Sequence, residues 1–116
     1  MVVEHYSFGR ITIDGKTYTS DVIIYPGRVD SSWWREEGHN LRIVDLADVI
    51  RAKPQILVVG AGAYGAMKVA KDVLSYLESK GIEVHVEETD RAVELFNEFQ
   101  KDKKDKVVIA ALHLTC

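Results

Sequence analysis

The sequence feature that most constrains the fold is a glycine-rich loop that directly follows a run of apolar residues. The run covers residues 55–60, and the loop Gly60-Ala61-Gly62-Ala63-Tyr64-Gly65 fits the pattern Gly-x-Gly-x-x-Gly. A short apolar run bounded by glycine is typical of a buried strand, and we predict a helix over residues 63–80. A strand, a glycine loop and a helix in this order favour an α/β fold with parallel strands.

The second half of the chain continues the alternation of strand and helix. Gly81 stands where a glycine commonly ends a helix, and residues 82–86 predict a second strand. Thr89 or Asp90 is placed to cap a further amphipathic helix. Residues 106–115 are a nearly continuous apolar run, which predicts a third strand. These segments predict a short parallel sheet of β-α-β-α-β order with two main helices.

The first half of the chain has the pattern of antiparallel strands. The pair Asp14-Gly15 stands between residues 8–13 and residues 16–18, and such a pair is the strongest short-range signal for a β-hairpin. Residues 21–25 predict a further strand that ends at Pro26-Gly27. The predicted fold class is therefore mixed α/β, with antiparallel N-terminal strands packed beside the parallel sheet.

A long polar segment and a short helix connect the two halves. Residues 28–40 predict a loop anchored by aromatic side chains, and loops of this length are often functional. Asp45 is placed to cap a short helix over residues 46–51, which must end before Pro54.

Length and composition favour one ordinary globular domain over residues 1–116. The chain is 47% hydrophobic and 28% charged, with a formal net charge of −3 and no strongly basic face, so nucleic acid is not an expected partner. No apolar run approaches the roughly 20 residues that span a bilayer. The only cysteine is Cys116, which precludes an internal disulfide and is compatible with the cytoplasm, the expected location.

The glycine loop is the first candidate site. Glycine lets a ligand approach the backbone, and the N-terminus of the predicted helix would present unpaired amides to an anion. Glu87 follows the next strand, where a dinucleotide fold places a ribose-binding carboxylate, although a second half of such a fold is missing. Three interpretations stay open: a nucleotide, a smaller anion or polar ligand, and glycines that simply allow tight packing.

Ligands of open α/β sheets bind beyond the carboxyl ends of the parallel strands, and that edge supplies the candidate ligand-binding residues. They are Gly60, Gly62, Gly65, Thr89, His113 and Thr115. A thiolate at Cys116 activated by His113 is disfavoured by the alternation of a strand, which sends residues three apart to opposite faces. We therefore assign no catalytic residue.

The segment around the two tryptophans supplies the candidate loop or partner-binding residues Trp33, Trp34, Arg35 and His39. In one interpretation the segment closes over the glycine loop and contacts a ligand or partner. In the other, a tryptophan caps the core and Arg35 stacks on it or pairs with Glu36. The four histidines are scattered, with no spacing typical of a zinc site, so no metal and no cofactor is expected.

Five motifs in a fixed order resemble the Mth938-type domain family, which also contains a mitochondrial complex I assembly factor. The motifs span nearly the whole chain: Phe8-Gly9 with its hairpin, Trp34-Arg35-Glu36 followed by Gly38-His39, the run from Ile56 to Gly62, Thr89-Asp90-Arg91-Ala92-Val93 with Phe96-Asn97, and the ending His113-Leu114-Thr115-Cys116. The resemblance implies antiparallel strands beside a short parallel sheet with two main helices. It also implies assembly or regulatory factors without established catalytic residues.

Two functional hypotheses follow. The first is a non-catalytic binding, assembly or regulatory protein that holds an unknown protein partner at the carboxyl edge, and it predicts an exposed apolar or aromatic patch. The alternative is an enzyme or sensor that binds an anionic metabolite or nucleotide at residues 60–65, and it predicts a closed polar pocket. If no cavity lies beside Gly62, only a surface role remains.

Overall fold

The fold is built on a five-stranded mixed sheet whose strands lie in the order β5-β4-β10-β7-β9. A computed structural model describes all of residues 1–116. Its first half contains β1 (Val3–Ser7), β2 (Arg10–Ile13), β3 (Lys16–Tyr18), β4 (Val22–Tyr25), β5 (Arg28–Asp30), β6 (Asn40–Leu41), a 3-10 turn η1 (Ile43–Leu46) and α1 (Ala47–Arg51). Its second half contains β7 (Ile56–Ala61), β8 (Lys68–Val69), α2 (Lys71–Ser79), β9 (Glu83–Glu87), α3 (Thr89–Asp102) and β10 (Val108–His113).

The centre of this sheet is parallel and its other side is antiparallel. β7 pairs in parallel with both β10 and β9, whereas β4 runs antiparallel to β10 and to β5. Every residue of β7 and β10 is buried, because helices cover both faces, and this explains why both strands read as continuous apolar runs. The predicted mixed α/β fold class is confirmed.

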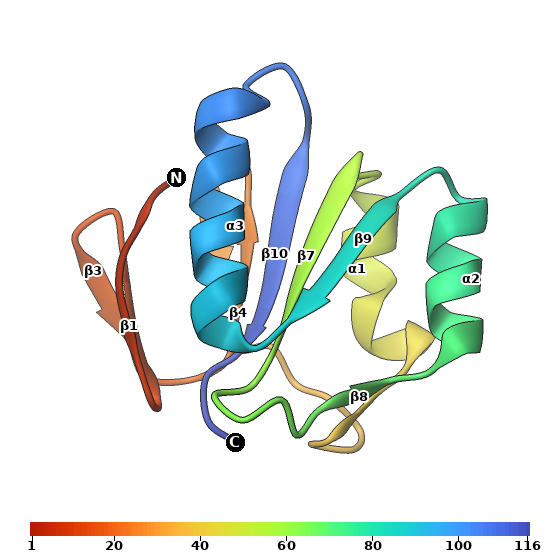
Figure 1. Cartoon of the computed structure of the whole chain (residues 1–116), viewed down its shortest axis with the longest axis horizontal. Coiled ribbons are helices and arrows are strands. Elements are labelled where there is room, and N and C mark those ends of the chain that lie inside the picture. The colour runs from red at the N-terminus through yellow and green to blue at the C-terminus, as the bar shows by residue number, and fades with distance from the viewer.

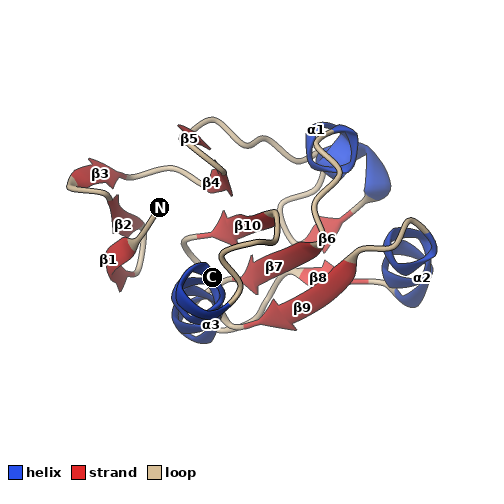
Figure 2. Cartoon of the chain, turned by 90° about the horizontal axis from the view of Figure 1, so that it is seen from above, coloured by secondary structure: helices blue, strands red, loops and turns tan.

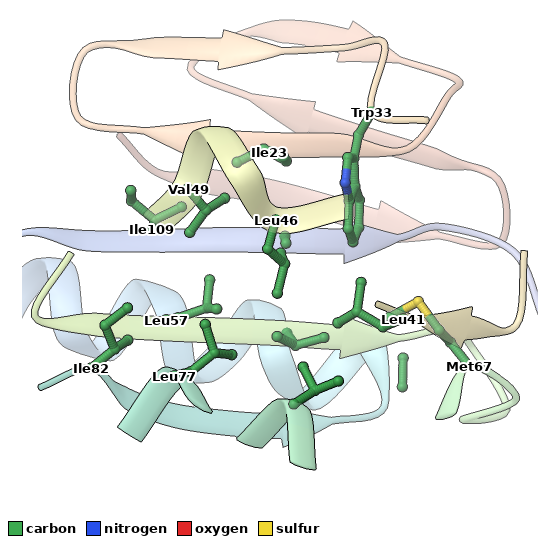
Figure 3. Packing of buried hydrophobic residues seen from close by; sticks show 14 of the residues in the cluster. Ile23, Trp33, Leu41, Leu46, Val49, Leu57, Met67, Leu77, Ile82 and Ile109 are labelled. Carbon is green, nitrogen blue, oxygen red and sulfur yellow. The ribbon is translucent and has the colours of Figure 1, made fainter. Parts of the chain in front are cut away.

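Helices on opposite sides of the sheet enclose two hydrophobic clusters. Figure 2 shows α3 on one side and α1 and α2 on the other. Alternate residues of β10 divide between the clusters: Ala110 and Leu112 pack with Phe96 of α3, while Ile109 and Ala111 belong to the cluster on the other face. Figure 3 shows that second cluster, in which Trp33, Leu41 and Met67 lie toward the carboxyl ends of β7 and β10.

The N-terminal strands form a separate three-stranded antiparallel sheet in the order β1-β2-β3, which stands beside α3 (Figure 1). The predicted hairpin is confirmed, and its turn residues Asp14 and Gly15 have positive φ angles of 49° and 82°. β1 was not predicted, because Val3 is its only buried residue and the apolar signal is weak. The side-chain amide of Asn97 on α3 holds β1, since it accepts from the amide of Val3 and donates to its carbonyl.

The predicted helix over residues 63–80 is wrong in its first half. Gly62 and Gly65 have φ angles of 102° and 69°, which no helix contains, and the chain then extends into β8, which pairs with β6. The amide of Met67 donates to Ala61 and that of Lys68 to His39, so both bonds lie outside a helical pattern. The helix α2 therefore begins only at Lys71.

The predicted loop over residues 28–40 is also shorter than expected. Arg28–Asp30 form β5, because the turn at Pro26-Gly27 folds this segment back onto β4. The predicted helix over residues 46–51 corresponds to α1, which the 3-10 turn precedes. Asp45 lies within that turn, and its carboxylate accepts the amides of Arg42 and Glu36 rather than capping α1 itself.

Candidate functional site

The three parallel strands β7, β9 and β10 end at one edge, where the loop after β7 and the C-terminus also lie (Figure 1). Thr89, the first residue of α3, joins two of these strand ends. Its hydroxyl accepts a 2.9 Å hydrogen bond from the amide of Gly62 and donates a 2.6 Å bond to the carbonyl of His113. The N-cap residue of α3 is Glu88 and no side chain caps the helix, so the predicted cap at Thr89 or Asp90 is wrong.

The amides of the glycine loop are bonded to the C-terminal segment of the same chain. The amide of Ala63 donates to the carbonyl of Thr115 at 2.7 Å, and the amide of Ala66 donates to that of Cys116 at 3.2 Å. Since α2 begins at Lys71, the loop does not lead directly into a helix. The N-terminus of α3 does lie beside the loop, and there the amide of Thr89 donates to the carbonyl of Gly62 at 3.0 Å. The prediction that a helix starting within the loop presents its free amides to an anion is therefore wrong.

Gly60 and Gly62 lie where side chains do not fit. A Cβ atom on Gly60 would approach both Leu112 and Thr89 to 2.9 Å, and one on Gly62 would lie 2.6 Å from the carbonyl oxygen of Cys116. The molecule has four surface hollows, and none is lined by any of the six candidate ligand-binding residues. The glycine pattern thus has a packing explanation, and no cavity lies beside Gly62.

A buried group of charged side chains lies at the same edge. The Arg35 guanidinium donates from Nη1 to Oδ2 of Asp21 at 2.9 Å, and the same oxygen lies 2.8 Å from Nδ1 of His113. Arg35 also donates to the carbonyl of Gly38 and stacks on the ring of Trp33 at 4.7 Å. The side chains of Arg35 and His113 are only 5% and 7% exposed. The core-capping interpretation of Trp33 and Arg35 fits these contacts, but the carboxylate partner is Asp21 and not Glu36.

The ionised form of Asp21 is favoured in this group. Burial by itself raises the pKa of Asp21, but the hydrogen bonds from His113, the amide of Leu114 and Arg35 outweigh burial and leave the pKa below its usual range. The carboxylate therefore balances the buried guanidinium. Asp21 was missed by sequence reasoning; the one signal for it is an acidic residue directly before an apolar strand.

One nitrogen of the His113 ring has no hydrogen-bond partner. Nδ1 lies within hydrogen-bond distance of both Asp21 and Arg35, at 2.8 Å and 3.1 Å. A guanidinium only donates and a carboxylate only accepts. Nδ1 donates when it is protonated and accepts when it is not, so it forms a hydrogen bond with only one of the two groups at a time. In either assignment Nε2 is buried and unpaired. A substrate would have to displace the covering side chains to reach it.

His39 and Cys116 continue the group toward the surface. The rings of His39 and His113 meet edge to face, with their centroids 5.7 Å apart. The thiol of Cys116 lies 4.0 Å from Nε2 of His39, so its imidazole neighbour is His39 rather than the His113 considered in the sequence. No three histidine, cysteine or acidic side chains lie close enough together to hold a metal ion.

The most exposed aromatic side chains lie at two places. Trp33 is 8% exposed and belongs to the core, whereas its neighbour Trp34 is 75% exposed. Phe8, in the turn between β1 and β2, and Tyr64, in the glycine loop, are 56% and 74% exposed, and their ring centroids lie 6.1 Å apart. We call these two residues the Phe8–Tyr64 pair. Phe8 was not predicted as a site residue, because the sequence of a turn does not indicate which distant residue its side chain contacts.

No helix of the chain has the length and apolar character that crossing a membrane would require.

Comparison with known proteins identifies the family of the chain and shows which solved structures share its fold. A family model described as "Protein of unknown function (DUF498/DUF598)" matches residues 3–113. A conserved hypothetical protein of Pyrococcus horikoshii OT3, PH1505, is 28% identical with a TM-score of 0.80, and the match covers 100% of both chains. The protein MT938 is 24% identical with a TM-score of 0.80, covering 99% of this chain and 98% of that one. A Mth938-like domain of Bordetella pertussis, solved in solution by NMR, is 19% identical with a TM-score of 0.67, covering 97% of this chain and 85% of that one.

Proposed function

For this chain, which belongs to the DUF498/DUF598 family of unknown function and has the Mth938-like fold, we propose the role of a non-catalytic binding protein. In this proposal it acts as an assembly or regulatory factor, and it holds a protein partner against the carboxyl edge of β7, β9 and β10. We propose that it does so in the cytoplasm.

The observation that carries the proposal is the exposed Phe8–Tyr64 pair beside an edge that the chain has sealed. Small-molecule sites are concave and bury most of their ligand, whereas protein interfaces use exposed aromatic side chains as anchors. At this edge the loop amides are bonded to Thr115 and Cys116 and no cavity lies beside Gly62. The edge offers a surface rather than a pocket.

Both rings stand on backbone that is held in place. Tyr64 follows Ala63, whose amide is bonded to Thr115, and lies in the loop that Thr89 ties to β10. The turn that carries Phe8 is fixed by the amide of Gly9, which donates to the carbonyl of Leu114 at 2.9 Å. A partner would therefore meet a pre-organised surface, and little ordering of backbone would oppose binding.

The test is affinity purification of the tagged chain from its own cells, with quantification of the proteins that co-purify in stoichiometric amount. We expect a defined partner with the wild-type chain, and about a tenfold or greater loss of it with Phe8→Ser and Tyr64→Ser combined. Both side chains are exposed, so the variant should keep its melting temperature within a few degrees. Retention of every partner by the folded double variant would reject the proposal.

The alternative, an enzyme or sensor for an anionic metabolite or nucleotide at residues 60–65, requires the C-terminal segment to leave the loop. A thermal-shift screen against nucleotides, phosphates and small carboxylates separates the two hypotheses, because a ligand of the folded state raises the melting temperature. We expect no shift from any of them. A shift that Gly62→Val removes, in a variant that still folds, would favour the alternative.

A further inference from the structure

A hollow of about 280 Å³ lies where the segment after β5 meets the start of α1. We call it the Trp34 hollow. Half of its lining is apolar, and the other half consists of carboxylates and one serine. The lining residues are Ile23, Asp30, Ser32, Trp33, Trp34, Glu36, Val44, Asp45, Ala47 and Asp48. Neither Phe8 nor Tyr64 lines the hollow, and only Trp33, on which Arg35 stacks, is shared with the buried group at the carboxyl edge.

The hollow carries unbalanced negative charge. Its lining includes four carboxylates and no basic side chain. Glu36 is paired with Arg42 at 3.0 Å and Asp48 with Arg51 at 2.8 Å, on exposed surface. The half-buried Asp30 and Asp45 accept hydrogen bonds from neighbouring backbone amides, and neither forms an ion pair. A cation placed here would meet two carboxylates that no basic side chain neutralises.

The walls of the hollow suit a flat cation on an apolar stem. The indole of Trp34 is 75% exposed and offers an aromatic face, to which cations are attracted. The adjacent Trp33 is fixed, because its indole nitrogen donates to the carbonyl of Asp45 at 3.0 Å. Val44 is exposed at the rim and adds apolar surface. The volume of the hollow lies below the range of about 300–1,000 Å³ that holds drug-sized ligands, so it fits a single side chain.

We propose that the Trp34 hollow is the docking site for one arginine side chain, carried by a basic segment of a protein partner. The guanidinium stacks on Trp34 and donates to Asp30 and Asp45, while the methylene stem packs against Val44. Arginine fits better than lysine because its planar group stacks on aromatic rings and presents several donors at once. This inference does not rest on the function proposed above, since neither Phe8 nor Tyr64 lines the hollow.

The test is an NMR titration of the full chain with a capped Gly-Gly-Arg-Gly-Gly peptide. Analogues with lysine or with neutral, isosteric citrulline serve as comparisons. We expect binding of the arginine peptide in about the millimolar range, as befits a single side chain, with shifts centred on residues 30–36 and 44–48. Binding should be about fivefold or more weaker for lysine and absent for citrulline.

Two variants probe the contacts. Trp34→Ala and Asp30→Asn should each weaken binding of the arginine peptide about fivefold or more. The control Glu78→Gln removes an exposed carboxylate on α2, which does not line the hollow, and should leave binding unchanged. Equal binding of arginine and citrulline, equal effects of Asp30→Asn and Glu78→Gln, or no shifts around the hollow would each overturn the proposal. A dimer of the free protein that Trp34→Ala dissociates would make a second copy the occupant and overturn it too.

Discussion

Oδ2 of Asp21 lies 2.8 Å from Nδ1 of His113, and this contact joins the residue before β4 to the last residue of β10. The same oxygen accepts from Arg35, which comes from the segment between β5 and β6. The group therefore fastens the loop that carries Trp33 and His39 to the sheet. This ion pair is costly to break, because the guanidinium of Arg35 is almost completely buried and Asp21 is its counter-charge.

Replacement of Asp21 by asparagine should strongly destabilise the fold. Asp21→Asn keeps the size of the side chain but leaves the 5% exposed guanidinium of Arg35 without a counter-charge. We expect a loss of about 3–5 kcal/mol in the free energy of unfolding, measured by urea denaturation. Glu36→Gln breaks the exposed pair with Arg42 and should cost less than about 1 kcal/mol. Equal losses in the two variants would contradict a structural role for the buried group.

The same carboxylate should make stability fall in acid. The pKa of Asp21 is lower in the folded protein than its usual value of about 3.9 in an unfolded chain, so the unfolded state binds the proton more readily. Its contribution is complete above that value and is lost as pH falls through the folded pKa. Urea midpoints measured from pH 7 to pH 3 should drop below about pH 4 in the wild type and drop less in Asp21→Asn. Parallel pH profiles would contradict this.

The parallel sheet and its edge could be predicted from sequence because their signals are local. The apolar runs of β7 and β10 and the pair Asp14-Gly15 each fix an element within a few residues. The start of α2 could not be predicted from sequence. The pattern Gly-x-Gly-x-x-Gly does not show that Gly65 has a φ of 69°, which turns the chain away from a helix.

Some residues of the candidate site could likewise be predicted from sequence and others could not. Thr89 and His113 were predicted to lie at one edge because the carboxyl ends of parallel strands meet there, and their 2.6 Å bond agrees with that placement. Asp21 was missed because its partner His113 is 92 residues away in the chain. The two tryptophans have the same local pattern, so only the tertiary structure decides that Trp33 enters the core and Trp34 remains exposed.

A side chain at Gly62 should destabilise the sealed edge. Gly62 has a φ of 102°, and a Cβ atom there would lie 2.6 Å from the carbonyl oxygen of Cys116. For Gly62→Ala we expect the free energy of unfolding to fall by about 1–3 kcal/mol because of backbone strain. The steric overlap of the new Cβ atom with Cys116 should add to this loss. Gly38→Ala is the matched control, since nothing lies within 4 Å of its Cβ position and its φ is not in the left-handed region. Unfolding curves that show no difference between the two would disprove the close approach.

Thr89 should matter for its hydroxyl rather than for its shape. Thr89→Val preserves the volume but leaves the amide of Gly62 and the carbonyl of His113 without their bonds to that hydroxyl. Each buried group left unpaired costs about 1–3 kcal/mol. Thr89→Ser keeps the hydroxyl and should retain most of the stability. Hydrogen exchange gives the local readout: the Gly62 amide proton should exchange slowly in the wild type and in Thr89→Ser, and much faster in Thr89→Val. Slow exchange at Gly62 in the folded valine variant would mean that another group holds the glycine loop to β10.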